Sequence, residues 1–462
     1  MTKRTFLEIV SALVGWPALS ARTAWGSADK LTNWAGNLEY ASTSVHAARS
    51  LDDVRAFVKS HPKLKVLGTR HCFNTIADSP HGFLSVGELG EIVGLDVPSD
   101  AAALVDRNAA VRTVTVGAGT RYGQLAPQLH EKGFALHNLA SLPHIAIAGA
   151  CATATHGSGE KNGNLASAVR ALELVTAAGD VVQLSAEKSG EDFHGAVVGL
   201  GALGVVTKVT LAIEPAFAMR QWVYENLPLA QMKDHFDAIE ASAYSVSLFT
   251  DWQGQRIREV WIKSLAEGGL KPFPAPEEYF GAKRATRNLH PIAELGAENC
   301  TEQMGVPGPW YERLPHFRMG FTPSAGKELQ SEYFVPRKHA VEAILALEKL
   351  RDQITPHLLI SEIRAIAADS LWMSPCYRQD SIAIHFTWKQ DWPAVSRLLP
   401  VIEKELGPFG ARPHWGKLFT LAPSVLRSRY ERLPDFLALA RKYDPHGKFR
   451  NEFLDRNVYG LG

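Results

Sequence analysis

A histidine follows a glycine-led turn in the segment Gly68-Thr69-Arg70-His71-Cys72-Phe73-Asn74. The mostly apolar residues just before it, 64–67, predict a buried strand, so His71 would stand where that strand ends. An imidazole in this position can act as a base or a nucleophile, although most loop histidines only form hydrogen bonds. His71 becomes a candidate for chemistry only if a second segment points to the same site.

A long run of small residues is that second segment. Small side chains let the backbone approach a ligand closely, and successive exposed N–H groups suit a pyrophosphate because they donate without side-chain bulk. A tight buried turn would hardly need so many small residues in succession. The run reads Ser141-Leu142-Pro143-His144, then Ala148-Gly149-Ala150, then Thr153-Ala154-Thr155-His156-Gly157-Ser158-Gly159.

Two segments of the C-terminal half carry polar side chains at alternate positions. If residues 359–366 form a strand, Glu362 and Arg364 point the same way, and in 381–388 the same holds for His385 and Thr387. The first pair can jointly hold hydroxyl groups of a ligand. The pattern alone fits equally well two antiparallel strands that are half exposed to water.

Strands and helices must bring these residues together. Strands are predicted at 113–116 and 205–213, a hairpin at 172–184, and a helix at 122–132 that stops at Gly133. After Pro215 longer helical runs appear, including Val341, Ile344, Leu345 and Leu350 at helical spacing, while 268–308 is predicted to be connecting loops. The fold class is therefore α+β, with a second domain after Pro215.

A competing signal is the segment Gly199-Leu200-Gly201-Ala202-Leu203-Gly204, which matches the GxGxxG fingerprint of dinucleotide-binding folds. That fingerprint needs a strand before it, a helix after it and an acidic residue about twenty positions further on. Here a strand beginning at Val205 follows instead of a helix. We therefore reject the Rossmann interpretation.

Together, the His71 turn and the small-residue run resemble the PCMH-type FAD-binding domain of the vanillyl-alcohol oxidase superfamily, from about Asn33 to Pro215. The resemblance implies FAD bonded covalently through His71. Relatives with a second, cysteinyl bond have a cysteine where this chain has Ser141-Leu142, so one bond is implied and Cys72 is a packed thiol. The implied cofactor contacts are Gly68, Thr69, Arg70, His71, Cys72, Ser141, Ala148, Gly149, Thr153, Thr155, His156, Gly157, Val205 and His414.

The segment His414-Trp415-Gly416-Lys417 resembles a signature of the aldonolactone and alditol oxidases, and Asp444-Pro445, Gly447-Lys448-Phe449 and Asn451 match the C-terminal ending of that group. The resemblance implies an FAD domain at 33–217 and a substrate or cap domain at 218–462. The cap would contain an antiparallel sheet flanked by helices, and its last part, about 415–462, would pack back on the FAD domain. The Glu362 and Arg364 pair is closer to alditol oxidases, of the xylitol or sorbitol type, than to gulonolactone or arabinonolactone oxidases.

The chemistry that this resemblance implies is hydride transfer from an alcohol carbon to flavin N5, followed by reduction of O2 to peroxide. Arg364 and Lys417 would flank the reacting hydroxyl, while Glu362, Ser141 and Thr387 hold the substrate. Lys417 and His385 both remain candidates for the base. The alternatives are an aldonolactone oxidase, a dehydrogenase that passes electrons to a quinone or cytochrome, and a sugar-binding protein without catalysis.

The first 32 residues are typical of an export signal. Lys3 and Arg4 precede an apolar stretch, 6–19, and small residues follow it, which predicts a twin-arginine-like signal and a periplasmic enzyme. The alternative is a cytoplasmic protein whose N-terminal helix docks on the domain. A formal charge of +1 argues against nucleic acid as a partner, four scattered cysteines argue against a zinc site, and no later apolar run is long enough to span a bilayer.

Overall fold

The computed structural model describes residues 30–96, 112–266, 272–320 and 327–461. The chain from residue 31 onward forms one compact unit. Residues 1–29, most of the proposed export signal, lie outside the described residues, so export and a periplasmic location stay predictions. Within the described ranges, no helix combines the length and the apolar character that crossing a membrane would require.

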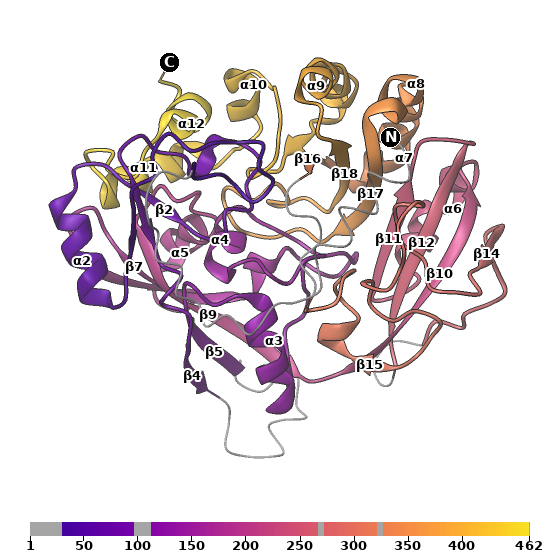
Figure 1. Cartoon of the computed structure of the whole chain (residues 1–462), viewed down its shortest axis with the longest axis horizontal. Helices are drawn as coiled ribbons and strands as arrows, with labels where there is room; N and C mark the ends of the chain where they lie inside the picture. Colours follow the sequence, from indigo (N-terminus) through magenta and orange to yellow (C-terminus); the bar gives the residue numbers. More distant parts are fainter. Residues whose placement is uncertain (1–29, 97–111, 267–271, 321–326, 462) are drawn as a thin grey trace. The chain divides into compact units, whose positions relative to one another are not determined.

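The N-terminal half contains two sheets (Figure 1). One is a parallel sheet of three strands in the order β1-β3-β2, and the other is antiparallel, in the order β4-β5-β9-β7-β8, with β6 paired to β9. The strands are β1 (Val45–Ala47), β2 (Lys65–Leu67), β3 (Phe83–Ser85), β4 (Ile92–Asp96), β5 (Arg112–Gly117), β6 (Phe134–Ala135), β7 (Val169–Val175), β8 (Val181–Ser185) and β9 (Val205–Pro215). The predicted strands and the β7–β8 hairpin are confirmed.

The helices that cover these sheets have apolar residues at helical spacing, which gives each helix one apolar face to pack against a sheet. In α3, Leu125 and Leu129 face a core that they share with Val114 of β5 and Leu211 of β9. The predicted stop is confirmed, since α3 ends before Gly133, which adopts a φ of +81°. The helices of this half are α2 (Leu51–Ser60), α3 (Tyr122–Glu131), α4 (Ile147–Ala152) and α5 (Gly190–Val197).

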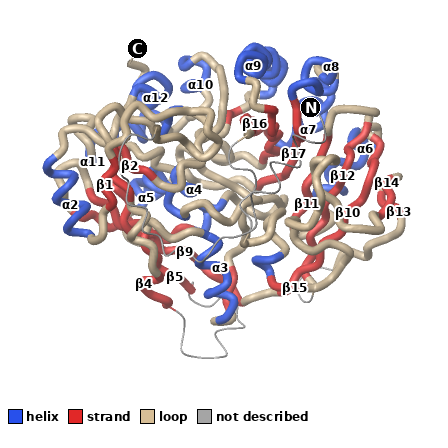
Figure 2. Tube along the Cα trace, viewed as in Figure 1, coloured by secondary structure: helices blue, strands red, loops and turns tan. Residues whose placement is uncertain are grey.

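The second half is built on an antiparallel sheet of ten strands, in the order β13-β14-β10-β12-β11-β17-β18-β16-β19, with β15 paired to β10. Helices α6, α7 and α9 contribute to the apolar core on one side of this sheet (Figure 2). The strands are β10 (Ala218–Pro228), β11 (Ser245–Thr250), β12 (Arg256–Leu265), β13 (Glu278–Tyr279), β14 (Ala282–Arg284), β15 (Gly308–Pro309), β16 (Glu328–Pro336), β17 (Leu358–Ile366), β18 (Ser381–Lys389) and β19 (Arg412–Pro413). The helices are α6 (Gln231–Glu240), α7 (Ala340–Glu348), α8 (Arg351–Ile354) and α9 (Trp392–Leu406).

Three expectations for this half need correction. Residues 268–308 are not only loops, because they contain the β13–β14 hairpin and reach β15. The helix predicted through Leu350 ends at Glu348, and Leu350 precedes the short α8. The alternative of half-exposed strands is wrong for β17 and β18, in which every residue is buried apart from the half-buried Leu359 and the exposed Lys389.

The chain ends with α10 (Pro423–Ser428), α11 (Leu433–Tyr443) and α12 (Glu452–Leu454). Helix α11 packs against α5, and the amide of Asn451 donates to the backbone carbonyls of Thr75, Ile76 and Asp78. The antiparallel sheet with its helices confirms the α+β class. The exact domain limits stay a prediction, because residues 31 onward form a single compact unit.

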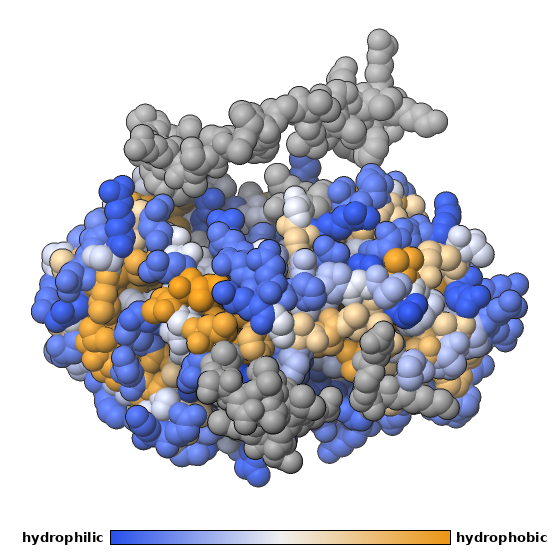
Figure 3. All heavy atoms as spheres, turned by 90° about the horizontal axis from the view of Figure 1, so that it is seen from below, coloured by the Kyte–Doolittle hydropathy of each residue, from blue (hydrophilic) through white to orange (hydrophobic). Residues whose placement is uncertain are grey.

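The outer surface mixes hydrophilic and hydrophobic side chains on the face drawn in Figure 3. Hydrophilic residues cover most of that face, and hydrophobic ones gather in patches between them.

Candidate active site

A cavity of about 360 Å³ lies between the segments that the sequence singled out. The His71 turn and the small-residue run form one side, and strands β16, β17 and β18 contribute the other. The lining includes Gly68, Thr69, Arg70, His71, Cys72, Ser141, Gly149, Thr153, Thr155, His156, Glu362, Arg364, His385, Thr387, His414 and Lys417. The structure therefore brings most of the predicted site residues together.

Three predicted cofactor contacts are not among the described residues that line the cavity: Ala148, Gly157 and Val205. Val205 is fully buried in β9, where it belongs to an apolar cluster. Gly157 packs against Asn138 and the Leu139 carbonyl so closely that a Cβ would collide with both. Close packing therefore explains why residue 157 is a glycine. The cofactor roles of Ala148, Gly157 and Val205 stay predictions.

The His71 turn is held in a strained conformation. Arg70 has a φ of +61°, which costs a residue other than glycine about 1–2 kcal/mol. Backbone bonds secure the turn, since the Arg70 carbonyl accepts from the Trp34 N–H at 2.8 Å and the Phe73 N–H donates to the Gly416 carbonyl at 2.7 Å. The amide of Asn74 also donates to the carbonyls of Trp415 and Lys417. The His71 turn and the segment carrying Lys417 are thus fastened to each other.

His71 has an imidazole whose Nδ1 is shielded from water and has no hydrogen-bond partner among the described residues. Burial, with smaller contributions from His144 and Lys417, lowers the pKa of His71 to about 3. The imidazole is therefore neutral at ordinary pH, with a lone pair to offer, and the Trp34 ring holds it edge-on at 4.4 Å. These properties fit a histidine that bonds to a flavin.

The small-residue run leaves room beside the His71 turn. At Gly149, on α4, an added Cβ would meet no protein atom within 4 Å, so the cavity wall is open there. Ala154, two residues after the helix, adopts a φ of +56°, a second strained position next to the cavity. An open wall of small residues fits the pyrophosphate of a bound dinucleotide, as the sequence predicts.

The polar end of the cavity is built from one row of the large sheet. Glu332 of β16 lies opposite His385 of β18, which in turn lies opposite Glu362 of β17. Residues directly opposite each other share a face, so the three side chains point into the same cavity. Gln330 and Thr387 form the next row on that face. Sequence reasoning missed Glu332 and Gln330, although their alternate spacing is the signal that identified the residues of β17 and β18.

Glu332 is the centre of this polar end. It is only 1% exposed, and it accepts from Arg364 Nη2 and from Lys417 Nζ, each at 2.8 Å. His156 Nε2 lies 3.2 Å from its Oε1. Burial by itself would raise the pKa of Glu332, but Lys417, His156 and Arg364 together hold it well below the usual value. The carboxylate is therefore ionised and keeps Arg364 and Lys417 beside each other.

Lys417 and His385 form a directed pair. Lys417 Nζ lies 2.8 Å from His385 Nδ1, and His385 Nε2 lies 3.0 Å from Thr387 Oγ1. While Lys417 is an ammonium, Nζ must donate to Nδ1, which puts the hydrogen of the neutral imidazole on Nε2, toward Thr387. Burial lowers the pKa of Lys417, although Glu332 partly opposes that effect. His385 then has no spare lone pair, which favours Lys417 over His385 as the base.

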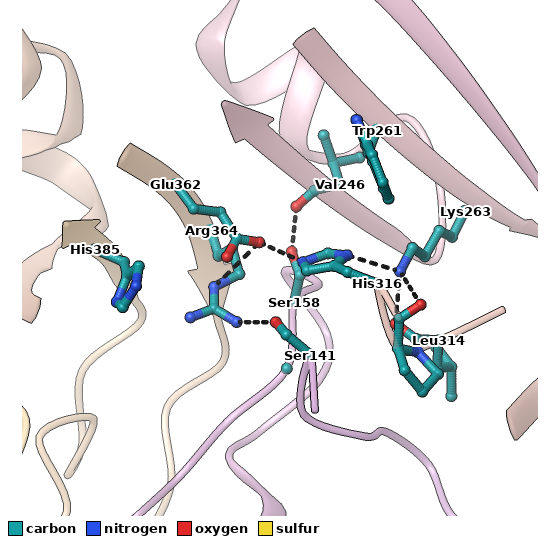
Figure 4. Close-up of polar contacts among 12 residues, drawn as sticks. Ser141, Ser158, Val246, Trp261, Lys263, Leu314, His316, Glu362, Arg364 and His385 are labelled. Carbon is teal, nitrogen blue, oxygen red and sulfur yellow. Dashed lines mark hydrogen bonds and ion pairs between the residues drawn. The ribbon is translucent and has the colours of Figure 1, made fainter. Parts of the chain in front are cut away.

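Glu362 and Arg364 connect the sheet to the small-residue run, as Figure 4 shows. Arg364 Nη1 donates to Ser141 Oγ at 3.4 Å, and its Nε lies 3.6 Å from Glu362 Oε1. Burial alone would raise the pKa of Glu362, but Arg364 and His316 outweigh it and hold the pKa far below the usual value. Glu362 is therefore an ionised acceptor in the cavity wall.

Segments in both halves of the chain match known protein families. A model of the FAD binding domain matches residues 45–185, and a model of D-arabinono-1,4-lactone oxidase matches residues 323–457. The chain is 47% identical over 425 residues to the alditol oxidase of a Streptomyces species, which covers 92% of this chain and 98% of that protein. It is 26% identical to the L-gulono-1,4-lactone dehydrogenase of Mycobacterium tuberculosis, over 92% of this chain and 98% of that protein.

The fold is also known. Cholesterol oxidase from B. sterolicum superimposes with a TM-score of 0.72 over 93% of this chain and 96% of that one, at 15% sequence identity. An identity this low shows a shared fold and carries no information about the substrate. The arrangement of a flavin-binding half and a large antiparallel sheet is thus one that known oxidases share.

Proposed function

This chain belongs to the alditol and aldonolactone oxidase group of FAD-dependent oxidoreductases in the vanillyl-alcohol oxidase superfamily, and we propose that it oxidises an alcohol carbon of an open-chain polyol such as xylitol or sorbitol. Molecular oxygen is the proposed acceptor, and hydrogen peroxide the second product. The observation that carries the proposal is the ionised Glu362 carboxylate in the cavity wall, in a chain that is 47% identical to an alditol oxidase.

Glu362 favours polyols over lactones because of what each substrate offers. An open-chain polyol presents adjacent hydroxyl groups that donate to a carboxylate. An aldonolactone also carries hydroxyl groups, but its carbonyl and ring oxygens can only accept, so it offers fewer donors to a carboxylate. Charge-assisted hydrogen bonds are worth about 1.5–3 kcal/mol, so one contact that only the polyol makes favours it by about ten- to a hundredfold.

The proposed roles follow from the donors and acceptors around Glu332. Bound FAD supplies the hydride acceptor at flavin N5. A neutral Lys417 has two N–H groups, and both are used by Glu332 and His385, so its lone pair is left to take the hydroxyl proton of the substrate. Arg364 donates to the oxygen as that proton leaves, which stabilises its growing negative charge. Ser141, Thr387 and Glu362 hold the neighbouring hydroxyl groups.

Attachment of the flavin through His71 is part of the same proposal. The support is the neutral imidazole whose Nδ1 no described residue occupies, on a turn that is fastened to the segment carrying Lys417. A covalent bond there would fix the flavin relative to the base. A periplasmic location also remains a proposal, supported by the Lys3-Arg4 pair and the apolar stretch behind it.

The test is peroxide release under air with xylitol, sorbitol, gulono-1,4-lactone and galactono-1,4-lactone supplied side by side. We expect the highest kcat/KM with a polyol. Higher kcat/KM with a lactone than with every polyol would replace the proposal with the aldonolactone oxidase alternative. Flavin reduction by a polyol without peroxide release, together with turnover on an added quinone, would instead identify a dehydrogenase.

A further inference from the structure

A buried lysine lies behind the substrate end of the cavity. Lys263, on β12, is 1% exposed, and its ammonium group is directed into the protein (Figure 4). Its Nζ donates to the Leu314 carbonyl at 2.6 Å and to the Pro315 carbonyl at 3.2 Å, and it lies 3.2 Å from His316 Nδ1. These three neighbours use the three N–H groups of an ammonium. The roles proposed for the cavity residues do not require this lysine, so its burial needs another explanation.

His316 connects Lys263 to the cavity. Its Nε2 lies 2.7 Å from Glu362 Oε1, on the side of the ring opposite the contact with Lys263. Phe249 and Trp261 hold the ring edge-on, with centroid distances of 5.4 and 5.3 Å. The imidazole therefore has a fixed position, with an ammonium on one nitrogen and a carboxylate on the other.

The neighbours of His316 place the hydrogen of its neutral imidazole on Nε2. The ionised Glu362 needs a donor, so Nε2 must carry a hydrogen. Burial lowers the pKa of His316 to about 4, so the ring is neutral and its Nδ1 has a lone pair. Nδ1 must then accept, and Lys263 is the donor that it meets. Without this donor, the Nδ1–H tautomer would become available, and Nε2 would present a lone pair to the carboxylate.

We propose that Lys263, acting through His316, is a positioning residue that decides which oxygen of Glu362 receives the substrate. Both close contacts of this carboxylate that involve described residues, with His316 and with Arg364, fall on Oε1. The other oxygen, Oε2, is left for a substrate hydroxyl. The inference rests on the proposed polyol oxidation and extends it to a residue that contacts neither substrate nor flavin.

The chain of contacts from Lys263 through His316 to Glu362, called the relay below, is sensitive to pH because charged and titratable groups surround Lys263. They are Glu362 and Arg364 on β17, and Cys300 and Arg313 in the segment that leads to His316. Burial lowers the pKa of Lys263 to about 7, against the opposing effect of Glu362. When the ammonium loses its proton, the amine keeps two N–H groups for the two carbonyls and turns a lone pair toward Nδ1. Nδ1 then loses its obligatory donor, so the preference of His316 for the Nε2–H tautomer should weaken as the pH rises past about 7.

The experiment compares Lys263→Met, His316→Gln and the double variant. The glutamine amide can donate to Glu362 without any tautomer, so His316→Gln should remove the dependence of the polyol KM on Lys263. Lys263→Met alone should raise the polyol KM about tenfold or more while kcat changes less, and it should add little in the His316→Gln background. Lys448→Met is the control, since this lysine also donates to a backbone carbonyl but at Val58. An equal loss on Lys263→Met in both backgrounds would show that Lys263 only anchors the segment carrying Leu314, which overturns the proposal.

A second measurement separates this inference from the proposed function and does not depend on turnover. Ring nitrogen-15 chemical shifts of the holoenzyme, with the His316 signal identified by its absence in His316→Gln, report the tautomer directly. We expect Nε2–H at pH 6 in the unmodified enzyme and its loss in Lys263→Met. If both tautomers are found as expected but no polyol is oxidised, the proposed substrate is wrong and the role of Lys263 in setting the His316 tautomer still holds. An Nδ1–H tautomer at pH 6 would refute the relay even if polyols are oxidised.

Discussion

Glu332→Gln removes the negative charge at the centre of the site while keeping the shape of the side chain. The carboxylate accepts from Arg364 and Lys417, each at 2.8 Å. Arg364 bonds to Oε1 and Lys417 to Oε2, so replacing one of these oxygens with NH2 leaves one of the two groups facing a donor instead of an acceptor. The lost charge-assisted bond is worth about 1.5–3 kcal/mol.

The expected loss of polyol kcat/KM is about tenfold to a hundredfold, since 1.36 kcal/mol corresponds to a factor of ten in rate. The pH profile carries a signed prediction. Glu332 raises the pKa of Lys417 against the effect of burial, so its removal must lower that pKa further. The base is then neutral at lower pH, and the acidic limb of kcat/KM should move to lower pH even though the maximal rate falls.

The measurement is kcat/KM for xylitol by peroxide release between about pH 5 and 10. Glu403→Gln is the matched control, because Glu403 is also a buried carboxylate but bonds to the hydroxyls of Tyr333 and Thr420. We expect this control to keep the position of the acidic limb. An acidic limb that stays in place or moves to higher pH in Glu332→Gln would refute the assignment of Lys417 as the base.

Four further outcomes follow. Flavin absorbance should survive acid precipitation of the purified enzyme and be lost from precipitated His71→Ala; flavin that washes out of the unmodified enzyme would disprove the covalent bond. Lys417→Arg keeps a positive charge but cannot deprotonate, so kcat should fall by about 10²-fold or more with a smaller change in KM, as single-turnover flavin reduction would show. Glu362→Gln should lower polyol kcat/KM by about ten- to a hundredfold and affect lactones less, which parallel assays would reveal. N-terminal sequencing of native material should begin between about Ser20 and Asp29, and a Met1 or Thr2 start would contradict export.

The residues that sequence reasoning found share a local signal. Glu362 and Arg364 in β17, and His385 and Thr387 in β18, stand two positions apart, and that spacing is enough to place each pair on one face. The β7–β8 hairpin was likewise predictable from apolar runs on either side of a glycine turn at Gly179. Each of these inferences needs only neighbours along the chain.

The residues that were missed depend on pairing between distant segments. Glu332 becomes the central carboxylate only because β16 pairs with β18 in a register that puts it opposite His385. His316 lies in an irregular segment, and its contact with Lys263 joins residues 53 positions apart. No periodic sequence pattern could therefore have predicted its place in the site. The half-exposed alternative for β17 and β18 is wrong for the same reason, since a period of two cannot reveal what covers the polar face.

The charges along the bonded network restrict the substrate further. Lys263, Glu362, Arg364 and Glu332 alternate in sign and sum to zero when each is ionised, and Lys417 is neutral when it acts as the base. A neutral polyol or lactone adds no charge to this buried set. The carboxylate of a sugar acid would leave this buried set with an unbalanced negative charge, and about 4 Å from Glu362 it would meet a repulsion of about 4 kcal/mol at an effective dielectric constant of about 20, which Arg364 partly offsets. Charge therefore disfavours sugar acids, and the balance of hydrogen-bond donors and acceptors at Glu362 separates polyols from lactones.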